Sequence, residues 1–247
     1  CVLQPDYSTT GVDYKNYDPP RDLSVLIPEH DVHTVFLNKL TTYSQLKDLS
    51  KQGYDIFVNL CEGYLEWEVP SIDVIYTLEL LNLPFTGPTT KLYDPPKELM
   101  KYLAYCEGVK TPGYVLISEL ADVEEAVKHL TFPLFVKPAK AGDSLGVDER
   151  SLVKNKIELQ QKCISILEEY GPLLVEEYIA GREFTVLVAA NADEHSCTVF
   201  RPVEYLFPKG RAFKTYALKT SELHPDCNVP CSDEVLDKQL RAATERI

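Results

Sequence analysis

Short apolar runs alternate with helix-like segments along almost the whole chain, and this order restricts it to a mixed α/β architecture. In the clearest helical segment, residues 71–81, apolar side chains recur every three positions behind Ser71, which is expected to cap the helix. We expect the elements of the first part at residues 1–3, 34–37, 43–51, 55–60 and 71–81. Together they predict an N-terminal domain with a parallel sheet over residues 1–92.

A second block begins at Asp94-Pro95-Pro96, where an Asp cap and a proline at the helix start predict a helix over 97–106. Asp122 is expected to cap a further helix. Later strands are expected at 132–136, 173–178, 184–190 and 198–205, the last two as a hairpin, with a basic loop at 207–225 and helices at 156–170 and 233–247. We expect subdomains over 93–179 and 180–247. A helix that runs to the last residue predicts that the second subdomain is truncated.

The composition disfavours several classes of protein. Basic and acidic residues number 25 and 38, and the net charge of −13 opposes nucleic acid and anionic membranes as partners. No run approaches about 18 apolar residues, and no signal peptide is visible. Seven cysteines at irregular spacing favour free thiols and a cytoplasmic location. The signatures GxGxxG, GxxxxGK[ST], GxSxG and HExxH are absent, which disfavours dinucleotide oxidoreductases, P-loop NTPases, serine hydrolases and zincins.

Lys137 is the strongest single feature, because it ends an apolar strand and is followed by the segment Gly-Asp-Ser-Leu-Gly at 142–146. An ammonium at a strand end can meet a phosphate, and glycines allow backbone N–H groups to approach it. A plain turn with a solvated lysine is the alternative. Residues 201–219 hold five basic residues and one acidic residue, so this segment can supply positive charge to a polyphosphate. A solvated basic loop is again the alternative.

A second candidate feature is the strand end Glu176-Glu177-Tyr178-Ile179, with Glu183 shortly after it. Free backbone groups at a strand end can pair with the edge of an adenine, and a carboxylate can accept the ribose hydroxyls. Two glutamates at an exposed strand end are also common as solvated surface, so both interpretations stay open.

Taken in order, these segments resemble the ATP-grasp superfamily, and within it the D-alanine–D-alanine ligase group. The matching segments are FVNLCEG (57–63), LELLNLPFTG (78–87), Lys101 seven residues before Gly108, FPLFVKP (132–138), GDSLG (142–146), LVEEYIAGREFTV (174–186) and the triplet Phe213, Tyr216 and Lys219. The resemblance covers residues 55–219 well and the N-terminus loosely.

The resemblance implies an ATP-grasp fold and an ATP-dependent ligase that joins a carboxylate to an amine through an acyl-phosphate. Lys101 and Lys137 would hold the α- and β-phosphates, and Lys219 would reach the terminal phosphates and act in catalysis. The other implied nucleotide contacts are Lys140, Gly142 and Ser144 in the loop over the phosphates, Glu176, Glu177, Tyr178 and Ile179 at the adenine, and Glu183 at the ribose. The implied cofactors are ATP and Mg²⁺.

Departures from the family pattern fall on the substrate side. Asp143 replaces a serine, Thr220 replaces a tyrosine, Cys61-Glu62-Gly63 replaces a His-Gly pair, and no glycine-rich substrate segment is recognised near the N-terminus. ATP is therefore better supported than D-alanine. The family's metal ligands and a catalytic arginine lie beyond its equivalent of the last helix, so we assign no metal ligand and expect this chain alone to be inactive.

The expected partners are small carboxylate and amine substrates of the amino acid or dipeptide class, and a homodimer is left open. Two alternatives to the ligase remain. One is a non-catalytic nucleotide-binding relative, and the other is an ATP-grasp enzyme whose acceptor is not an amine.

Overall fold

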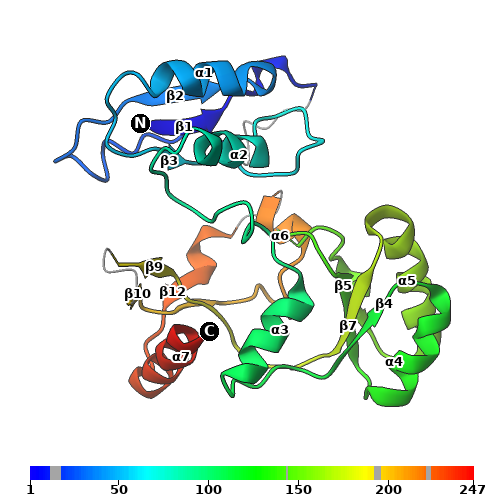
Figure 1. The fold of residues 1–247 in the computed structure, drawn as a ribbon. Coiled ribbons are helices and arrows are strands. Elements are labelled where there is room, and N and C mark those ends of the chain that lie inside the picture. The colour runs from blue at the N-terminus through cyan, green and yellow to red at the C-terminus, as the bar shows by residue number, and fades with distance from the viewer. Residues whose placement is uncertain (12–17, 143, 192–195, 221–223) are drawn as a thin grey trace. The chain divides into compact units, whose positions relative to one another are not determined.

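The structure is a computed structural model that describes residues 1–11, 18–142, 144–191, 196–220 and 224–247 (Figure 1). The chain divides into two compact units, residues 1–93 and 94–247. The further division at residue 179 remains a prediction. Among the described residues, every helix is too short or too polar to span a bilayer.

The first unit is a small parallel sheet with two helices. β1 (Val2–Pro5) lies between β2 (Thr34–Leu37) and β3 (Val58–Asn59), and both pairings are parallel, as the alternation of strand and helix predicts. All four residues of β1 are buried. α1 (Thr42–Leu49) and α2 (Ile72–Leu80) contribute apolar side chains to the same core. The core of this unit therefore forms between the sheet and its helices.

Ser71 and Asp122 occupy the N-cap positions of α2 and of the helix at Val123–His129, as expected, but neither side chain makes the cap hydrogen bond. The Ser71 hydroxyl donates to the Tyr64 carbonyl oxygen at 2.7 Å, and it makes no cap bond to α2. The Asp122 carboxylate accepts from the backbone N–H groups of Ser118 and Glu119 at 2.8 and 3.0 Å. Both side chains are thus engaged by the segment before the helix. The residue type fits either use, and the sequence pattern alone does not separate them.

The second unit is built on an antiparallel four-stranded sheet. Its order is β4 (Tyr114–Ile117), β7 (Leu173–Glu177), β5 (Leu134–Pro138) and β6 (Leu152–Val153). α4 (Val123–His129) and α5 (Lys156–Tyr170) cover one face of this sheet, and α3 (Lys97–Cys106) lies toward the other (Figure 1). Leu134, Val136 and Val175 point into the core beneath α4 and α5.

β4 was not expected from the sequence. It is an edge strand, and only Ile117 of its four residues is buried. An edge strand that is open to solvent on one face carries little apolar signal. Its neighbour β7 is buried at four of five positions and was expected at 173–178.

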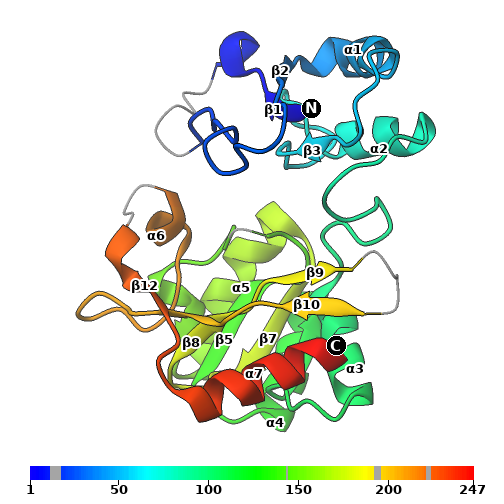
Figure 2. The same cartoon turned by 90° about the vertical axis from the view of Figure 1, so that its left-hand side faces the viewer.

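The rest of the second unit contains short antiparallel strands. β8 (Glu183–Thr185), β11 (Val203–Tyr205) and β12 (Asn228–Pro230) form one sheet, and β9 (Val188–Ala190) pairs with β10 (Cys197–Val199). The expected hairpin is therefore present but interrupted. The prediction of a loop throughout 207–225 is wrong, because α6 (Tyr216–Thr220) forms within it; residues 221–223 lie outside the described residues. α7 (Glu234–Arg246) packs beside β10 (Figure 2).

Candidate functional site

A cavity of about 590 Å³ lies on the face of the four-stranded sheet that α4 and α5 leave uncovered. Side chains alternate between the two faces of a strand. Since Val136 and Val175 face the core, Phe135 and Lys137 on β5 and Glu176 on β7 face the opposite way and line the cavity. The strand period alone thus brings a lysine, a carboxylate and an aromatic ring to one surface.

Glu176 joins two lysines at the floor of this cavity. Its Oε2 atom lies 3.0 Å from Nζ of Lys101 on α3, and its Oε1 atom contacts Nζ of Lys137. Lys101 also donates to the Pro112 carbonyl oxygen at 3.0 Å. Glu176 is only 9% exposed and Lys101 8%. Buried charges are costly unless they are paired, so this arrangement stabilises all three groups while leaving one net positive charge.

The loop after β5 borders the same cavity through Gly142, Ser144 and Leu145. Gly146 has a φ of +73°, and a Cβ atom there would lie 2.8 Å from Cγ of Pro138. Only glycine fits without displacing that ring. Asp143, the departure from the family serine, lies outside the described residues. The loop therefore turns back onto the end of its own strand.

A buried lysine on α5 supports the loop from behind. Lys162 donates from Nζ to the Gly146 carbonyl oxygen at 3.1 Å and to Oδ1 of Asp148 at 2.8 Å. Its side chain is 5% exposed. Burial alone would raise the pKa of Asp148, but the hydrogen bond and charge of Lys162, together with hydrogen bonds from Arg150, outweigh it, and the pKa is lowered. Asp148 is therefore held as a carboxylate next to the loop.

The strand end at 177–179 offers a free backbone donor. The N–H groups of Glu177 and Tyr178 donate to the carbonyl oxygens of Gly113 and Pro133, each at 3.0 Å. The N–H of Ile179 has no backbone partner within the described residues. The Glu177 carboxylate accepts from the Thr131 N–H at 3.0 Å. An unpaired N–H beside a cavity is a suitable partner for a ring nitrogen.

An aromatic wall stands next to this donor. The ring of Phe135 lies 6.3 Å from that of Tyr178 and 4.9 Å from that of Phe213, measured between centroids. The Tyr178 hydroxyl donates to the Ala212 carbonyl oxygen at 3.0 Å, which fixes the ring against the segment that carries Phe213. All three rings line the cavity. They provide an apolar surface against which a flat heterocycle can pack.

Most of the site residues proposed from the sequence line this one cavity: Lys137, Gly142, Ser144, Glu176, Glu177, Tyr178, Ile179, Glu183 and Lys219. Lys101 is connected to it through Glu176 without lining it. Lys140 is exposed and is not part of the lining. The nucleotide contacts assigned to these residues stay predictions.

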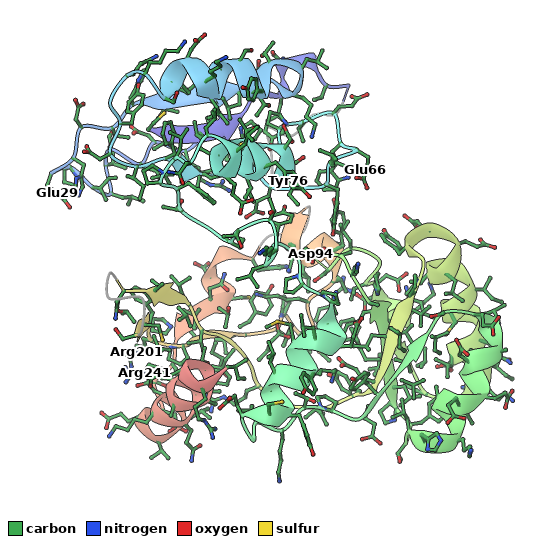
Figure 3. The ribbon with its side chains drawn as sticks, viewed as in Figure 1. Glu29, Glu66, Tyr76, Asp94, Arg201 and Arg241 are labelled. Atoms are coloured by element: carbon green, nitrogen blue, oxygen red, sulfur yellow. The ribbon has the colours of Figure 1, made fainter. Side chains whose placement is uncertain are left out.

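Lys97, Phe135 and Phe213 also line the cavity, and the sequence assigned none of them a role there, although the two phenylalanines belong to the segments that resemble the family. Lys97 stands four residues before Lys101, so both lie on one face of α3, and this spacing was the available signal. The expected helix cap Asp94, labelled in Figure 3, instead accepts from the Ala141 N–H at 3.3 Å. The N-cap position of α3 is Pro96. Asp94 therefore joins the start of α3 to the loop.

No cluster of three or more His, Cys, Asp or Glu side chains that could hold a metal ion occurs in the described parts of the chain. The acidic residues at the cavity are spread along it, and Glu176 is already engaged by two lysines. We therefore assign no metal ligand among the described residues, and we derive no step through the Mg²⁺ that the family resemblance implied.

Comparison with known proteins places this geometry in context. The family model described as D-ala D-ala ligase C-terminus matches residues 108–246. A D-alanine–D-alanine ligase of Marinomonas sp. is 33% identical over 45% of this chain and 35% of the relative. A D-alanine–D-alanine ligase of Bordetella petrii is 27% identical over 94% of this chain and 72% of the relative. The matched stretch thus spans about a third of the Marinomonas protein.

Among solved structures, the D-alanine–D-alanine ligase of Bacillus anthracis complexed with ATP superposes with a TM-score of 0.64 at 18% identity. That match covers 99% of this chain and 76% of the other. At this identity the likeness concerns the fold, and it confirms the ATP-grasp fold expected from the sequence. Because the family model covers more than half of the chain, this protein belongs to the D-ala D-ala ligase C-terminus family.

Proposed function

We propose that this chain binds ATP and is part of an ATP-dependent carboxylate–amine ligase. The observation that carries the proposal is the cavity itself. Lys137 and Lys219, the unpaired N–H of Ile179 and an aromatic wall all border one space of about 590 Å³. Pockets for small ligands have about 300–1,000 Å³, so the volume suits a nucleotide.

The geometry supports a particular orientation of the nucleotide. The adenine would pack against Phe135 and Phe213 and accept from the Ile179 N–H, while the triphosphate would extend toward Lys137 and the loop at 142–146. Glu183, which lines the same cavity, would accept the ribose hydroxyls. Lys219 would approach the terminal phosphates from α6. Charge-assisted hydrogen bonds of about 1.5–3 kcal/mol each can offset the unfavourable net charge of the chain.

The proposed reaction transfers the γ-phosphoryl group of ATP to a carboxylate. An amine then attacks the acyl-phosphate, phosphate leaves, and an amide bond and ADP are formed. Such chemistry depends on positioning and on stabilising negative charge, which lysines can supply. The relatives named above act on D-alanine by their names, and amino acids or dipeptides are the substrate class we infer here.

Titration calorimetry of the 247-residue chain with ATP, with and without Mg²⁺, tests the binding. We expect saturable binding that Lys137→Ala and Lys219→Ala each weaken by about tenfold or more, since each removes a charged partner of a phosphate. Lys110→Ala is the matched control, because Lys110 is an exposed lysine of the same unit outside the cavity. Absence of ATP binding by the unmodified chain would refute the proposal.

A second experiment separates the ligase from its alternatives. ADP release is measured on the product of the complete reading frame, because this chain alone is expected to be inactive. Amino acids, dipeptides and bicarbonate are the acceptors, and products are identified by mass spectrometry. An amide product supports the ligase, whereas a carboxylated product indicates another acceptor. ATP binding without turnover favours a non-catalytic nucleotide-binding role. These assays and the mass in solution address Mg²⁺ dependence and whether the protein is a homodimer. A cytoplasmic location remains part of the proposal.

A further inference from the structure

A second cavity, of about 470 Å³, lies behind the loop that borders the first one. Gly146 lines it, and Leu145 and Val147 line both cavities, so the loop separates the two spaces. α5 supplies most of the remaining lining, and α6 supplies Tyr216. The volume falls within the range of about 300–1,000 Å³ that small-molecule sites occupy. The function proposed above makes no use of this cavity.

One end of the second cavity is positively charged. Asp148 accepts from Nζ of Lys162 at 2.8 Å through Oδ1 and from Nη2 of Arg150 at 3.2 Å through Oδ2. Two cations thus share one carboxylate, and this end carries a net positive charge. The Arg150 side chain is 82% exposed, and its guanidinium has five N–H donors, so it can also bind a carboxylate from solution.

The other end of the cavity is negatively charged. Glu169 is exposed and lines it, seven residues after Lys162 on α5, which corresponds to about 10 Å along the helix axis. Between these two positions on the helix stands Ile166, which is buried and lines the cavity together with Val147. The cavity therefore combines an apolar surface with opposite charges at its two ends.

We propose that this second cavity binds a small zwitterion of the dipeptide class, with the ligand carboxylate at Arg150 and its ammonium at Glu169. An extended dipeptide measures about 7 Å between its termini, and a hydrogen bond at each end adds about 3 Å, so it can bridge charges about 10 Å apart. A single amino acid carries both charged groups on the same carbon atom and cannot reach both ends.

An occupant of this cavity touches the loop that the proposed function assigns to the phosphates, and this second part of the inference rests on that function. Lys162 holds the Gly146 carbonyl oxygen at 3.1 Å. The Tyr216 N–H donates to the Val147 carbonyl oxygen at 3.2 Å, which joins the loop to the helix that carries Lys219. A dipeptide packed behind the loop restrains it, so less conformational entropy is lost when ATP binds. ATP and dipeptide should therefore strengthen each other's binding by the same factor.

Calorimetry of the 247-residue chain without ATP tests the site, with D-alanyl-D-alanine and L-alanyl-L-alanine as probes. We expect saturable binding of at least one of them, weakened about fivefold by Arg150→Gln and by Glu169→Gln, since each variant removes one exposed charged partner. Glu168→Gln is the matched control, because Glu168 is exposed on the same helix and does not line the cavity. N-acetylated dipeptide, dipeptide amide and free alanine should each bind about fivefold more weakly or less.

Binding of neither dipeptide, or binding that Arg150→Gln and Glu169→Gln leave unchanged, would overturn the assignment. The coupling is tested by repeating the ATP titration in the presence of saturating dipeptide. We expect the ATP affinity to rise about two- to fivefold in the unmodified chain, and to stay constant in the double variant at the same dipeptide concentration. An ATP affinity that the dipeptide leaves unchanged or lowers would overturn the coupling. A chain that binds the dipeptide but no ATP would refute the proposed function and the coupling, and it would leave the dipeptide site supported.

Discussion

Replacement of Glu176 by glutamine tests the charge arrangement at the floor of the cavity. Glutamine keeps the size of the side chain and removes its charge. Lys101, whose side chain is 9% exposed, then loses its carboxylate, and so does Lys137, which is 23% exposed. Two ammonium groups would remain near one another with no anion between them, and the second unit should become less stable.

The size of the effect follows from the burial of the three groups. Removal of one partner from a buried ion pair costs about 3–5 kcal/mol, because the remaining charge is left without compensation. Lys137 is partly reached by water, which screens its charge, so we expect a value near the lower end, about 3 kcal/mol. Addition of ATP should restore part of the loss, since phosphates can take the place of the missing carboxylate.

Urea unfolding at neutral pH, followed by far-ultraviolet circular dichroism, measures this change. The single tryptophan, Trp67, belongs to the first unit, so its fluorescence gives an internal reference for that unit. Glu125→Gln is the matched control: Glu125 is an exposed partner of Lys128 and His129 on α4 and should contribute less than about 1 kcal/mol.

The double variant Lys101→Met, Glu176→Gln sharpens the test. Methionine removes the buried charge that the single variant leaves unpaired, so the double variant should be more stable than Glu176→Gln alone. A loss below about 1 kcal/mol for Glu176→Gln, or a double variant less stable than the single one, would refute the view that Glu176 stabilises the two lysines.

Three further predictions concern the loop and the aromatic wall. Because the pKa of Asp148 is lowered by folding, the contribution of this carboxylate to stability is complete above the unfolded pKa of 3.8 and is lost as the pH falls through the folded pKa. The difference in free energy of unfolding between the unmodified protein and Asp148→Asn, measured with urea, should therefore shrink below pH 3.8. A difference that stays constant with pH would contradict this. Gly146→Ala should lower the free energy of unfolding by about 1–3 kcal/mol, because Gly146 has a positive φ and an added Cβ would contact Pro138. Gly142→Ala is the control: it has open space around it and should change the free energy of unfolding by less than about 0.5 kcal/mol. Similar values for both variants would be inconsistent with the loop geometry. Phe213→Ala should weaken ATP and adenosine to the same extent in calorimetry, by about tenfold, if the ring packs against the base, and a loss confined to ATP would place the base elsewhere.

Local signals were sufficient for much of the fold. The helix at 156–170 was predicted with the bounds that α5 has. In the structure the Asn155 side chain caps its first N–H groups, and Gly171 follows its last turn with a φ of 73°. β2 was predicted over its full length, because it is a short apolar run with polar residues on both sides. β4 and α6 were missed because their residues are partly exposed, and contacts within the fold rather than local pattern determine them.

Only part of the arrangement at the cavity can be predicted from the sequence. The period of a strand predicts that Lys137 and Glu176 each face away from the core, but only the antiparallel register of β5 and β7 places one beside the other. The resemblance assigned Lys101 and Lys137 to phosphates and Glu176 to the base as separate contacts, whereas in the structure the three form one ion-paired group. A triphosphate must therefore compete with Glu176 for both lysines. That competition costs part of the attraction between the two lysines and an incoming phosphate.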